Sequence, residues 1–402
     1  MRNAPPRSPV LGVSALLALA ALVAGSTPAS AKDATVGPVA RHAEAVEVAP
    51  GLEHRLLIVH PVLARQAPAN AAETVRLGGT ASPDLLAFGH MEKSAKQRAD
   101  VVSFTPEPTV LLTGDVVRTE TADYAVSKDT VVPGTNPSQV PLVRISKEVD
   151  ADPKYAEPAM LGPVLPSALR YAMLLDVPGP GLRDLAERWA TDVRSVTPRR
   201  SPAELGTAEL IAKRVSDYRH SFAALPKPAA DREIVGCAIL VDGALAIFET
   251  FGSGKMFAEA WPKLLEGAAT EAAVEEVRLN LLGSDLADPA DPDRFLTELK
   301  RKLLDVFGAR TKETDVLEEG REFTLALDGA AARALVLGED RVVHFVLVTD
   351  PAHRADKAPG EGFDPLAAAR KARPTEEEKR LLDRRNGGQP VPAPADPPPA
   401  PK

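Results

Sequence analysis

The side chains in this chain that could do chemistry are mainly its carboxylates and its seven histidines. Four aspartates gather in one short stretch, at Asp285, Asp288, Asp291 and Asp293. Calcium prefers carboxylate oxygens, but the spacing is not that of an EF-hand loop and no glutamate closes it. In a structural role, Asp291 would cap a helix that begins with Pro292, and Asp293 would favour the helix dipole. We therefore predict no metal site and keep calcium at these aspartates as the alternative.

The histidines are spread along the chain without close pairs. His54 and His60 would lie about 20 Å apart on a regular strand, too far to share a metal ion. His344 lies in the apolar run 342–348, where a histidine that is hydrogen-bonded within a sheet is expected. If the chain is an enzyme, His60, Asp115 and His344 are the first candidates for a set assembled only in three dimensions.

The familiar catalytic motifs do not occur in this sequence: it has no His-Glu-x-x-His, Gly-x-Ser-x-Gly or Gly-x-Gly-x-x-Gly. Gly252-Ser253-Gly254-Lys255 resembles part of a phosphate loop. That loop, however, requires glycine where Glu249 stands and Ser or Thr where Met256 stands. We interpret it as a strand–helix turn whose backbone N–H groups could hold a small anion. The sequence assigns no catalytic residue, and we predict no cofactor.

The elements that must position these residues predict an α+β fold. In the N-terminal half, short apolar runs divided by Pro and Gly indicate a mainly antiparallel sheet system. These runs are 56–59, 101–104, 109–112, 116–117, 124–126 and 140–145. In the middle, apolar residues three and four positions apart predict helices over 182–196 and 211–222. The N-terminal half is thus β-rich and the middle helical.

The C-terminal part mixes β-hairpins with helices. Asp242-Gly243 between two apolar runs predicts a tight hairpin over 234–250. A helix begins near Lys255, and Pro262 should kink it or start a new segment. Further expected elements are a strand over 277–282, a helix over 292–307, a strand over 323–327 and a second hairpin over 332–348. We expect a single α+β domain over residues 47–350.

The two ends of the chain differ from this domain. Arg2 and Arg7 precede an apolar run over 10–24, which is followed by Ala29-Ser30-Ala31. This order is that of a secretory signal peptide over residues 1–31, and the apolar run is short for a membrane span. Residues 32–46 are expected to form a flexible lead-in. Residues 351–402 are expected to be a disordered tail, first charged and then rich in Pro and Ala.

Composition narrows the classes of partner. Removing residues 1–31 takes away two arginines and no acid, so the formal net charge moves from −8 to −10. An acidic surface of mixed sign argues against nucleic acid as a partner. Cys237 is the single cysteine, so no intrachain disulfide can form, and its apolar neighbours indicate a buried core position. We predict a periplasmic or secreted protein with no membrane span after signal cleavage.

Residues from about 48 to 349 resemble an uncharacterised bacterial family in the order and the residue types of their segments. The residues that carry the resemblance are Gly51-Leu52, 57–62, 112–117, Val132-Pro133, 140–143, Leu169-Arg170, Trp189, the stretch 234–265 and Val343-His344-Phe345. The family is the ARG and rhodanese-phosphatase-superfamily-associated protein domain family. Arg118-Thr119-Glu120-Thr121 and Val143-Arg144-Ile145 stand where members usually carry Lys-Gln-x-Arg and Cys-x-Glu. The resemblance implies a shared fold and no established reaction.

Two functions fit these observations. The first is a non-catalytic binding or scaffolding protein of the cell envelope, with an unknown protein or small-molecule partner. The second is a divergent hydrolase. A structure can discriminate between them, because a hydrolase requires its His and Asp side chains to converge in a pocket.

Overall fold

The computed structural model describes most of the chain between Pro38 and Pro351. The described residues are 38–65, 75–78, 86–91, 98–119, 122–134, 136–146, 160–177, 179–192, 209–225, 232–282, 312–317, 320–327, 329–338 and 341–351. The predicted signal peptide, the four clustered aspartates, the predicted helix over 292–307 and the predicted tail from residue 352 lie outside them.

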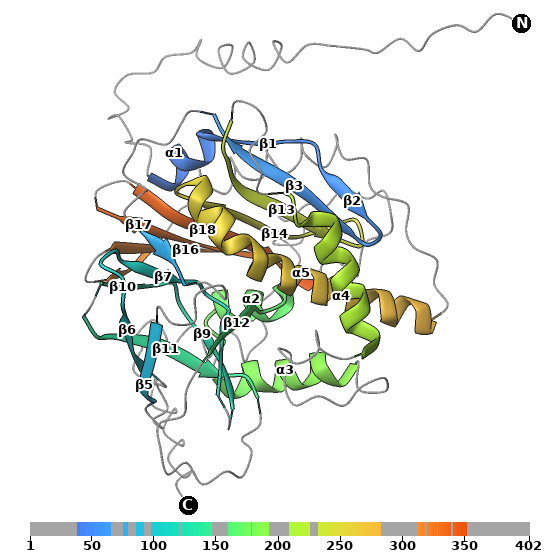
Figure 1. Ribbon diagram of the computed structural model, residues 1–402, viewed down its shortest axis with the longest axis horizontal. Coiled ribbons are helices and arrows are strands. Elements are labelled where there is room, and N and C mark those ends of the chain that lie inside the picture. The colour runs from blue at the N-terminus through green and yellow to red at the C-terminus, as the bar shows by residue number, and fades with distance from the viewer. Residues whose placement is uncertain are drawn as a thin grey trace, which may run out of the picture. The chain divides into compact units, whose positions relative to one another are not determined.

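The described residues form an α+β fold, as the sequence predicted (Figure 1). The helices are α1 (Pro38–Glu44), α2 (Ser167–Leu174), α3 (Gly179–Asp192), α4 (Glu209–Phe222) and α5 (Gly254–Leu282). The first twelve strands are β1 (Val46–Val48), β2 (Leu52–His54), β3 (Leu57–Ala64), β4 (Arg76–Leu77), β5 (Leu86–Met91), β6 (Arg98–Ser103), β7 (Thr109–Leu111), β8 (Asp115–Arg118), β9 (Asp123–Val126), β10 (Thr130–Val132), β11 (Ser138–Arg144) and β12 (Met160–Val164). The later strands are β13 (Ile234–Val241), β14 (Ala244–Phe251), β15 (Lys312–Leu317), β16 (Gly320–Leu327), β17 (Ala330–Leu337) and β18 (Arg341–Thr349).

The largest unit among the described residues is a nine-stranded sheet, which we call the main sheet. Its strand order is β1-β3-β13-β14-β18-β17-β16-β15, and β2 also pairs with β3. Its described pairs are antiparallel, and His60 on β3 lies opposite Ala238 on β13. The chain therefore leaves the main sheet after β3 and returns to the neighbouring position at β13. We call residues 65–233 the inserted segment.

The inserted segment forms two smaller sheets and three helices among the described residues. The sheets have the orders β12-β8-β9-β11-β6-β5 and β10-β7-β4. Valines and leucines of β6 to β11 form their own apolar cluster, and a second cluster joins β8 and β9 to α2 and α3. These two clusters give the inserted segment a core of its own.

Alternation of side chains across the main sheet separates two apolar clusters. On the first face, Cys237, Ile239 and Val346 pack with α4 and α5, which cover that face (Figure 1). On the second face, Phe248, Phe345 and Leu347 pack together with Val39 of α1. The main sheet is thus apolar on both sides, and a charge on either face needs a partner.

Several local predictions are confirmed. The hairpin of β13 and β14 turns at Asp242 and Gly243, whose φ angles of 52° and 72° suit a type I′ turn. Helices α3 and α4 lie where the apolar spacing predicted them, and Cys237 is fully buried. Burial raises the pKa of its thiol, so this cysteine belongs to the core.

Three local predictions differ from the structure. The stretch 277–282 was predicted as a strand but is the end of α5, because Val274 and Val277 continue the apolar stripe of that helix onto the sheet. A single helix runs through Pro262, so the new helical segment that we gave as one of two expectations there does not form. Residues 38–44, within the predicted flexible lead-in, instead form α1. None of the described helices is long and apolar enough to cross a membrane.

Candidate functional site

The first face of the main sheet carries a stripe of charged side chains in its middle strands. The stripe consists of Glu249 on β14, His344 on β18, Arg333 on β17 and Glu322 on β16. His344 lies directly opposite Phe251 and Leu335, so Glu249 and Arg333, each two residues further along, are its diagonal neighbours. Glu322 lies opposite Leu335 and is in the same way the diagonal neighbour of Arg333. Diagonal neighbours of this kind are within reach of long side chains. The stripe therefore places two acids and two bases in one row beneath the inserted segment.

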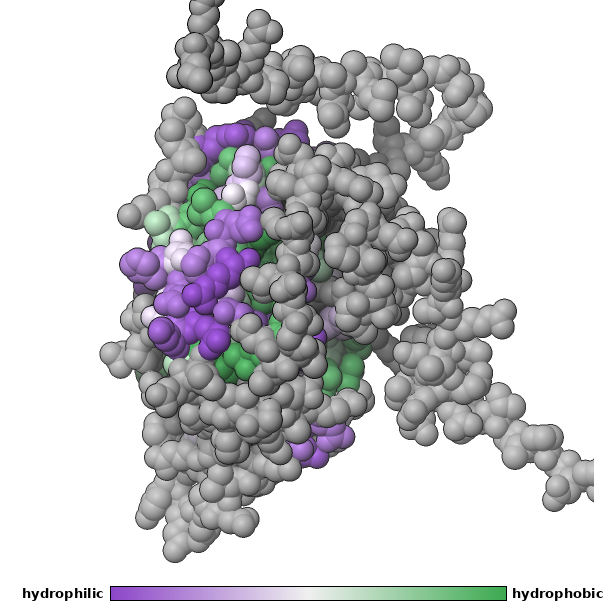
Figure 2. Space-filling model, turned by 90° about the vertical axis from the view of Figure 1, so that its right-hand side faces the viewer, coloured by the Kyte–Doolittle hydropathy of each residue, from purple (hydrophilic) through white to green (hydrophobic). Residues whose placement is uncertain are grey.

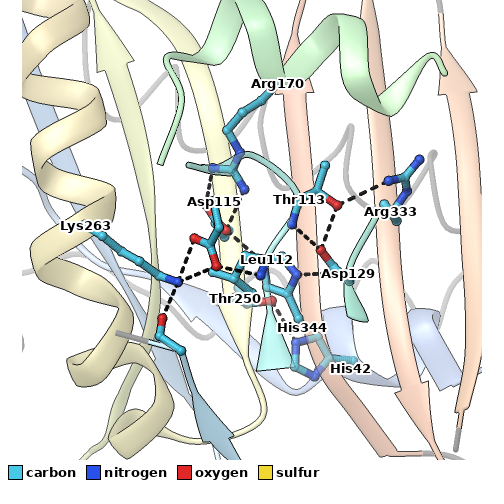
Figure 3. A network of polar contacts seen from close by, with 12 residues as sticks. His42, Leu112, Thr113, Asp115, Asp129, Arg170, Thr250, Lys263, Arg333 and His344 are labelled. Carbon is cyan, nitrogen blue, oxygen red and sulfur yellow. Dashed lines mark hydrogen bonds and ion pairs between the residues drawn. The ribbon is translucent and has the colours of Figure 1, made fainter. Parts of the chain in front are cut away.

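His344 lies between two carboxylates (Figure 3). Its Nδ1 is 2.5 Å from Asp129 Oδ2, and its Nε2 is 2.8 Å from Glu249 Oε1. Burial alone would lower the pKa of His344, but the two carboxylates raise it to about 9. Both ring nitrogens therefore carry hydrogens and donate them, and the ring is an imidazolium at neutral pH. In this geometry it cannot accept a proton from a substrate.

Arg170 binds Glu249 from above the sheet with two parallel hydrogen bonds. Its Nη1 and Nη2 donate to Glu249 Oε2 and Oε1, each at 2.8 Å. Burial would raise the pKa of Glu249, but Arg170 and His344 lower it to about 2. Arg170 is held in place because α2 begins at Ser167, whose N–H and hydroxyl donate to the carboxylate of Glu271 on α5.

Asp115 and Lys263 form a second buried pair. Lys263 Nζ on α5 donates to both carboxylate oxygens of Asp115, at 2.7 and 2.8 Å, and to Gly78 O at 2.7 Å. Gly114 precedes Asp115 with a φ of 92°, so the turn between β7 and β8 folds back and Leu112 N–H donates to Asp115 Oδ2 at 2.8 Å. Burial raises the pKa of Asp115, while the ammonium of Lys263 opposes that rise.

Arg333 connects the other end of the stripe to the inserted segment. Its Nε lies 2.9 Å from Glu322 Oε1, and its Nη1 donates to Ser127 O at 2.9 Å and to Thr113 Oγ1 at 3.2 Å. Thr113 in turn donates from both its N–H and its hydroxyl to Asp129 Oδ1. These bonds hold Asp129 in position, and together with the His344 imidazolium they keep its pKa well below its usual range.

Together these side chains form what we call the buried ion network. Its acids are Asp115, Asp129, Glu249 and Glu322, and its bases are Arg170, Lys263, Arg333 and His344. Each of them is at most 2% exposed. With His344 protonated the formal charges cancel, which meets the requirement that buried charges be paired. The network joins the main sheet, α2, α5 and the turns of the inserted segment.

Of the three candidate residues named from the sequence, two belong to the buried ion network and one lies outside it. Asp115 and His344 both belong to the network and are linked through Arg170 and Glu249. His60 lies apart from it on β3, where its Nδ1 is 3.1 Å from Ala49 O and its ring packs on Gly51. The first two candidates therefore converge, but inside the core.

The other sequence motifs also have structural partners where the structure describes them. The helix start at Gly254 is occupied by Glu233, whose Oε1 accepts the Gly254 N–H at 2.7 Å. A carboxylate thus fills the position in which we expected that a small anion could bind. In the described part of the chain, no three His, Cys, Asp or Glu side chains form a group that could hold a metal ion.

Sequence reasoning missed most members of the network. Glu249, Lys263 and Arg333 stand in elements that we predicted without a polar role. Asp129, Arg170 and Glu322 lie outside the predicted elements. One signal was present, because Arg333 interrupts the apolar run 330–337 on its inward-facing side. A single charge in such a strand indicates that a buried partner exists, although it does not identify the partner.

The fold and the network define the class: an α+β protein whose inserted segment is joined to the main sheet by buried ion pairs. Residues 193–348 match the family model of the ARG and Rhodanese-Phosphatase-superfamily-associated Protein domain. This match confirms the predicted resemblance over those residues. It includes Glu249, Lys263, Arg333 and His344, whereas Asp115, Asp129 and Arg170 precede it. No curated protein and no solved structure matches the chain.

Proposed function

We propose that the chain is an exported, non-catalytic binding or scaffolding protein of the cell envelope, located in the periplasm or secreted. The observation that carries the non-catalytic part is the engagement of His344. Both of its nitrogens donate to buried carboxylates, so the residue best suited to acid–base chemistry acts as a fixed cation. The network stabilises the attachment of the inserted segment, and a partner would bind elsewhere on the protein.

The described surface supports a partner other than nucleic acid. Arg55 pairs with Glu276 and Asp217, and Arg214 also pairs with Glu276, so positive charges on this part of the surface have acidic neighbours. Figure 2 shows one face on which described hydrophilic residues (purple) lie beside apolar ones (green). Paired surface charges of this kind do not produce the single-sign field that draws a protein to phosphate backbones.

Export is tested with the full chain carrying a C-terminal tag, followed by cell fractionation and N-terminal sequencing. We expect a product outside the cytoplasm that begins at Lys32. Ala31→Arg should block cleavage, since the site requires small residues at its first and third positions, whereas Ser30→Gln at the middle position should not. An uncleaved product in the membrane or cytoplasmic fraction would contradict export.

A divergent hydrolase is the alternative, and it is favoured by one observation: Asp115 and His344 do lie in the same network. The two functions are distinguished by assaying ester, phosphoester and peptide hydrolysis with wild type, His344→Gln and His220→Gln, the last altering an exposed histidine on α4. We expect no turnover that depends on His344. Turnover that is lost in a folded His344→Gln protein and kept in His220→Gln would favour the hydrolase.

A further inference from the structure

Helix α1 lies against the second face of the main sheet, opposite the buried ion network. Val39 of α1 is buried in the apolar cluster that also contains Phe248 and Phe345. After α1 the chain enters β1, which pairs with β3 at the edge of the sheet. The helix has only seven residues and would not be stable on its own, so its contacts with the sheet maintain it.

His42 is the polar contact between α1 and the middle of the sheet. Its Nε2 is 2.8 Å from Thr250 Oγ1 on β14, and the residue is partly buried (Figure 3). Thr250 directly follows Glu249, so the two side chains point to opposite faces of the strand. His42 and the network thus approach the same point of β14 from opposite sides.

This position makes a charge on His42 unfavourable. Burial lowers its pKa to about 4, and the positive charge of His344 contributes to the decrease. Among the other described charged residues near α1, two form ion pairs elsewhere and two are exposed. Glu249 is bound by Arg170 on the opposite face, Glu47 on β1 pairs with Arg232 at 2.9 Å, and Arg41 and Glu44 on α1 are exposed.

We propose that α1 is a strap released by acid: protonation of His42 detaches the helix from the main sheet while the rest of the described fold stays in place. The uptake of one proton puts a second cation close to His344 and into partly apolar surroundings. Detachment returns that cation to water and uncovers Thr250 and the apolar residues around Val39. The inference concerns contacts within the described residues and does not depend on export.

The direction of the pH effect follows from the linkage between protonation of His42 and release of α1. When α1 is released, His42 has the ordinary histidine pKa of about 6.5. When α1 is docked, the pKa of His42 is lower, about 4. Release is therefore favoured as the pH falls below about 6.5, and the effect levels off near pH 4. Glu249 and His344 beneath keep their charges in this range, since the pKa of Glu249 is about 2 and that of His344 about 9.

Hydrogen exchange of the full chain tests this proposal, read at residues 38–48 and at β13 and β14 and corrected for intrinsic rates. Between pH 8 and pH 5 we expect the protection of α1 to fall about 30-fold and that of β13 and β14 to stay unchanged. An unchanged α1 would overturn the proposal. A parallel loss at β13 and β14 would also do so, because it would indicate global unfolding.

Variants separate His42 from other titrating groups. His42→Gln cannot take up the proton yet keeps a side chain that can bond Thr250, so we expect strong α1 protection at both pH values. His220→Gln is the matched control and should keep the wild-type pH response. If His42→Gln responds to pH as wild type does, another group is responsible and the proposal is wrong.

Discussion

The two faces of the main sheet hold two histidines in opposite states. His344 on the first face lies between two carboxylates, and its pKa is raised to about 9. His42 on the second face meets a hydroxyl, and its pKa is lowered to about 4. Burial lowers the pKa of both rings, so the difference comes from the partners. A buried histidine is thus a permanent cation or a neutral, acid-sensitive group, depending on whether a carboxylate meets it.

The inserted segment and helix α1 are attached to the main sheet by different kinds of contact. The inserted segment is held to the main sheet by paired, fully buried charges. Among them, Glu249 with a pKa of about 2 and His344 with a pKa of about 9 stay charged between about pH 3 and pH 8. Helix α1 is held by apolar packing and a neutral histidine. One attachment should therefore tolerate changes in pH while the other responds to them.

Removal of Arg170 should have the largest effect on the first face. Arg170→Met leaves the carboxylate of Glu249 buried beside His344 alone, and we expect a loss of about 3–5 kcal/mol in the free energy of unfolding. Chemical denaturation at pH 7 measures it. Arg232→Met breaks an exposed ion pair with Glu47 and should cost less than about 1 kcal/mol. Equal effects of the two variants would contradict the claim that burial distinguishes them.

His344→Gln should cost about 3 kcal/mol at pH 6, as expected for a pKa raised from 6.5 to about 9. The stabilisation from His344 is fully present below pH 6.5 and is lost as the pH rises through 9. The difference between variant and wild type should therefore shrink toward pH 10. Denaturation curves at pH 6, 8 and 10 provide the measurement. A difference that grows with pH would show that the ring is neutral in the folded protein.

Lys263→Met should cost somewhat less, about 2 kcal/mol at pH 7. Asp115 loses its ammonium partner, but burial already raises its pKa, so it can take up a proton and become neutral. Asp115→Asn in the same chain removes the unpaired charge and should restore at least half of the loss. If the double variant is less stable than Lys263→Met alone, the pair is not the reason for the effect.

Thr250→Val should have the smallest effect and act on the second face alone. It removes the hydrogen bond to His42, for which we expect about 1 kcal/mol. The loss should appear as weaker exchange protection of α1 at pH 8, with little change in global stability. Thr130→Val, in a strand of the inserted segment, serves as the control and should leave α1 unchanged.

Local signals predicted local structure well. Asp242-Gly243 identified the hairpin of β13 and β14 because the pair favours the positive φ angles that this turn requires. The apolar spacing of Leu182, Leu185 and Trp189 identified α3, because residues three and four positions apart lie on one face of a helix. Residues 277–282 were misassigned because six alternating residues also fit the end of a helix whose stripe begins upstream.

The site was less predictable because its residues come together only through strand order and the return of the inserted segment. Asp115 and His344 were named as candidates, and they do meet in one network. His60 was named on equal grounds and lies elsewhere. No local pattern distinguishes these histidines, since each stands in an apolar strand.

By itself, then, the sequence determined the fold class, the main hairpins and helices, the buried position of Cys237 and the resemblance confirmed over residues 193–348. These follow from interactions between residues near one another in the chain. The tertiary structure alone decided the buried ion network, whose pairs are 79, 148 and 215 residues apart. The physical reason is that a charge becomes a buried partner only when a distant strand or turn covers it. The same cover decides which histidine is a cation and which one responds to acid.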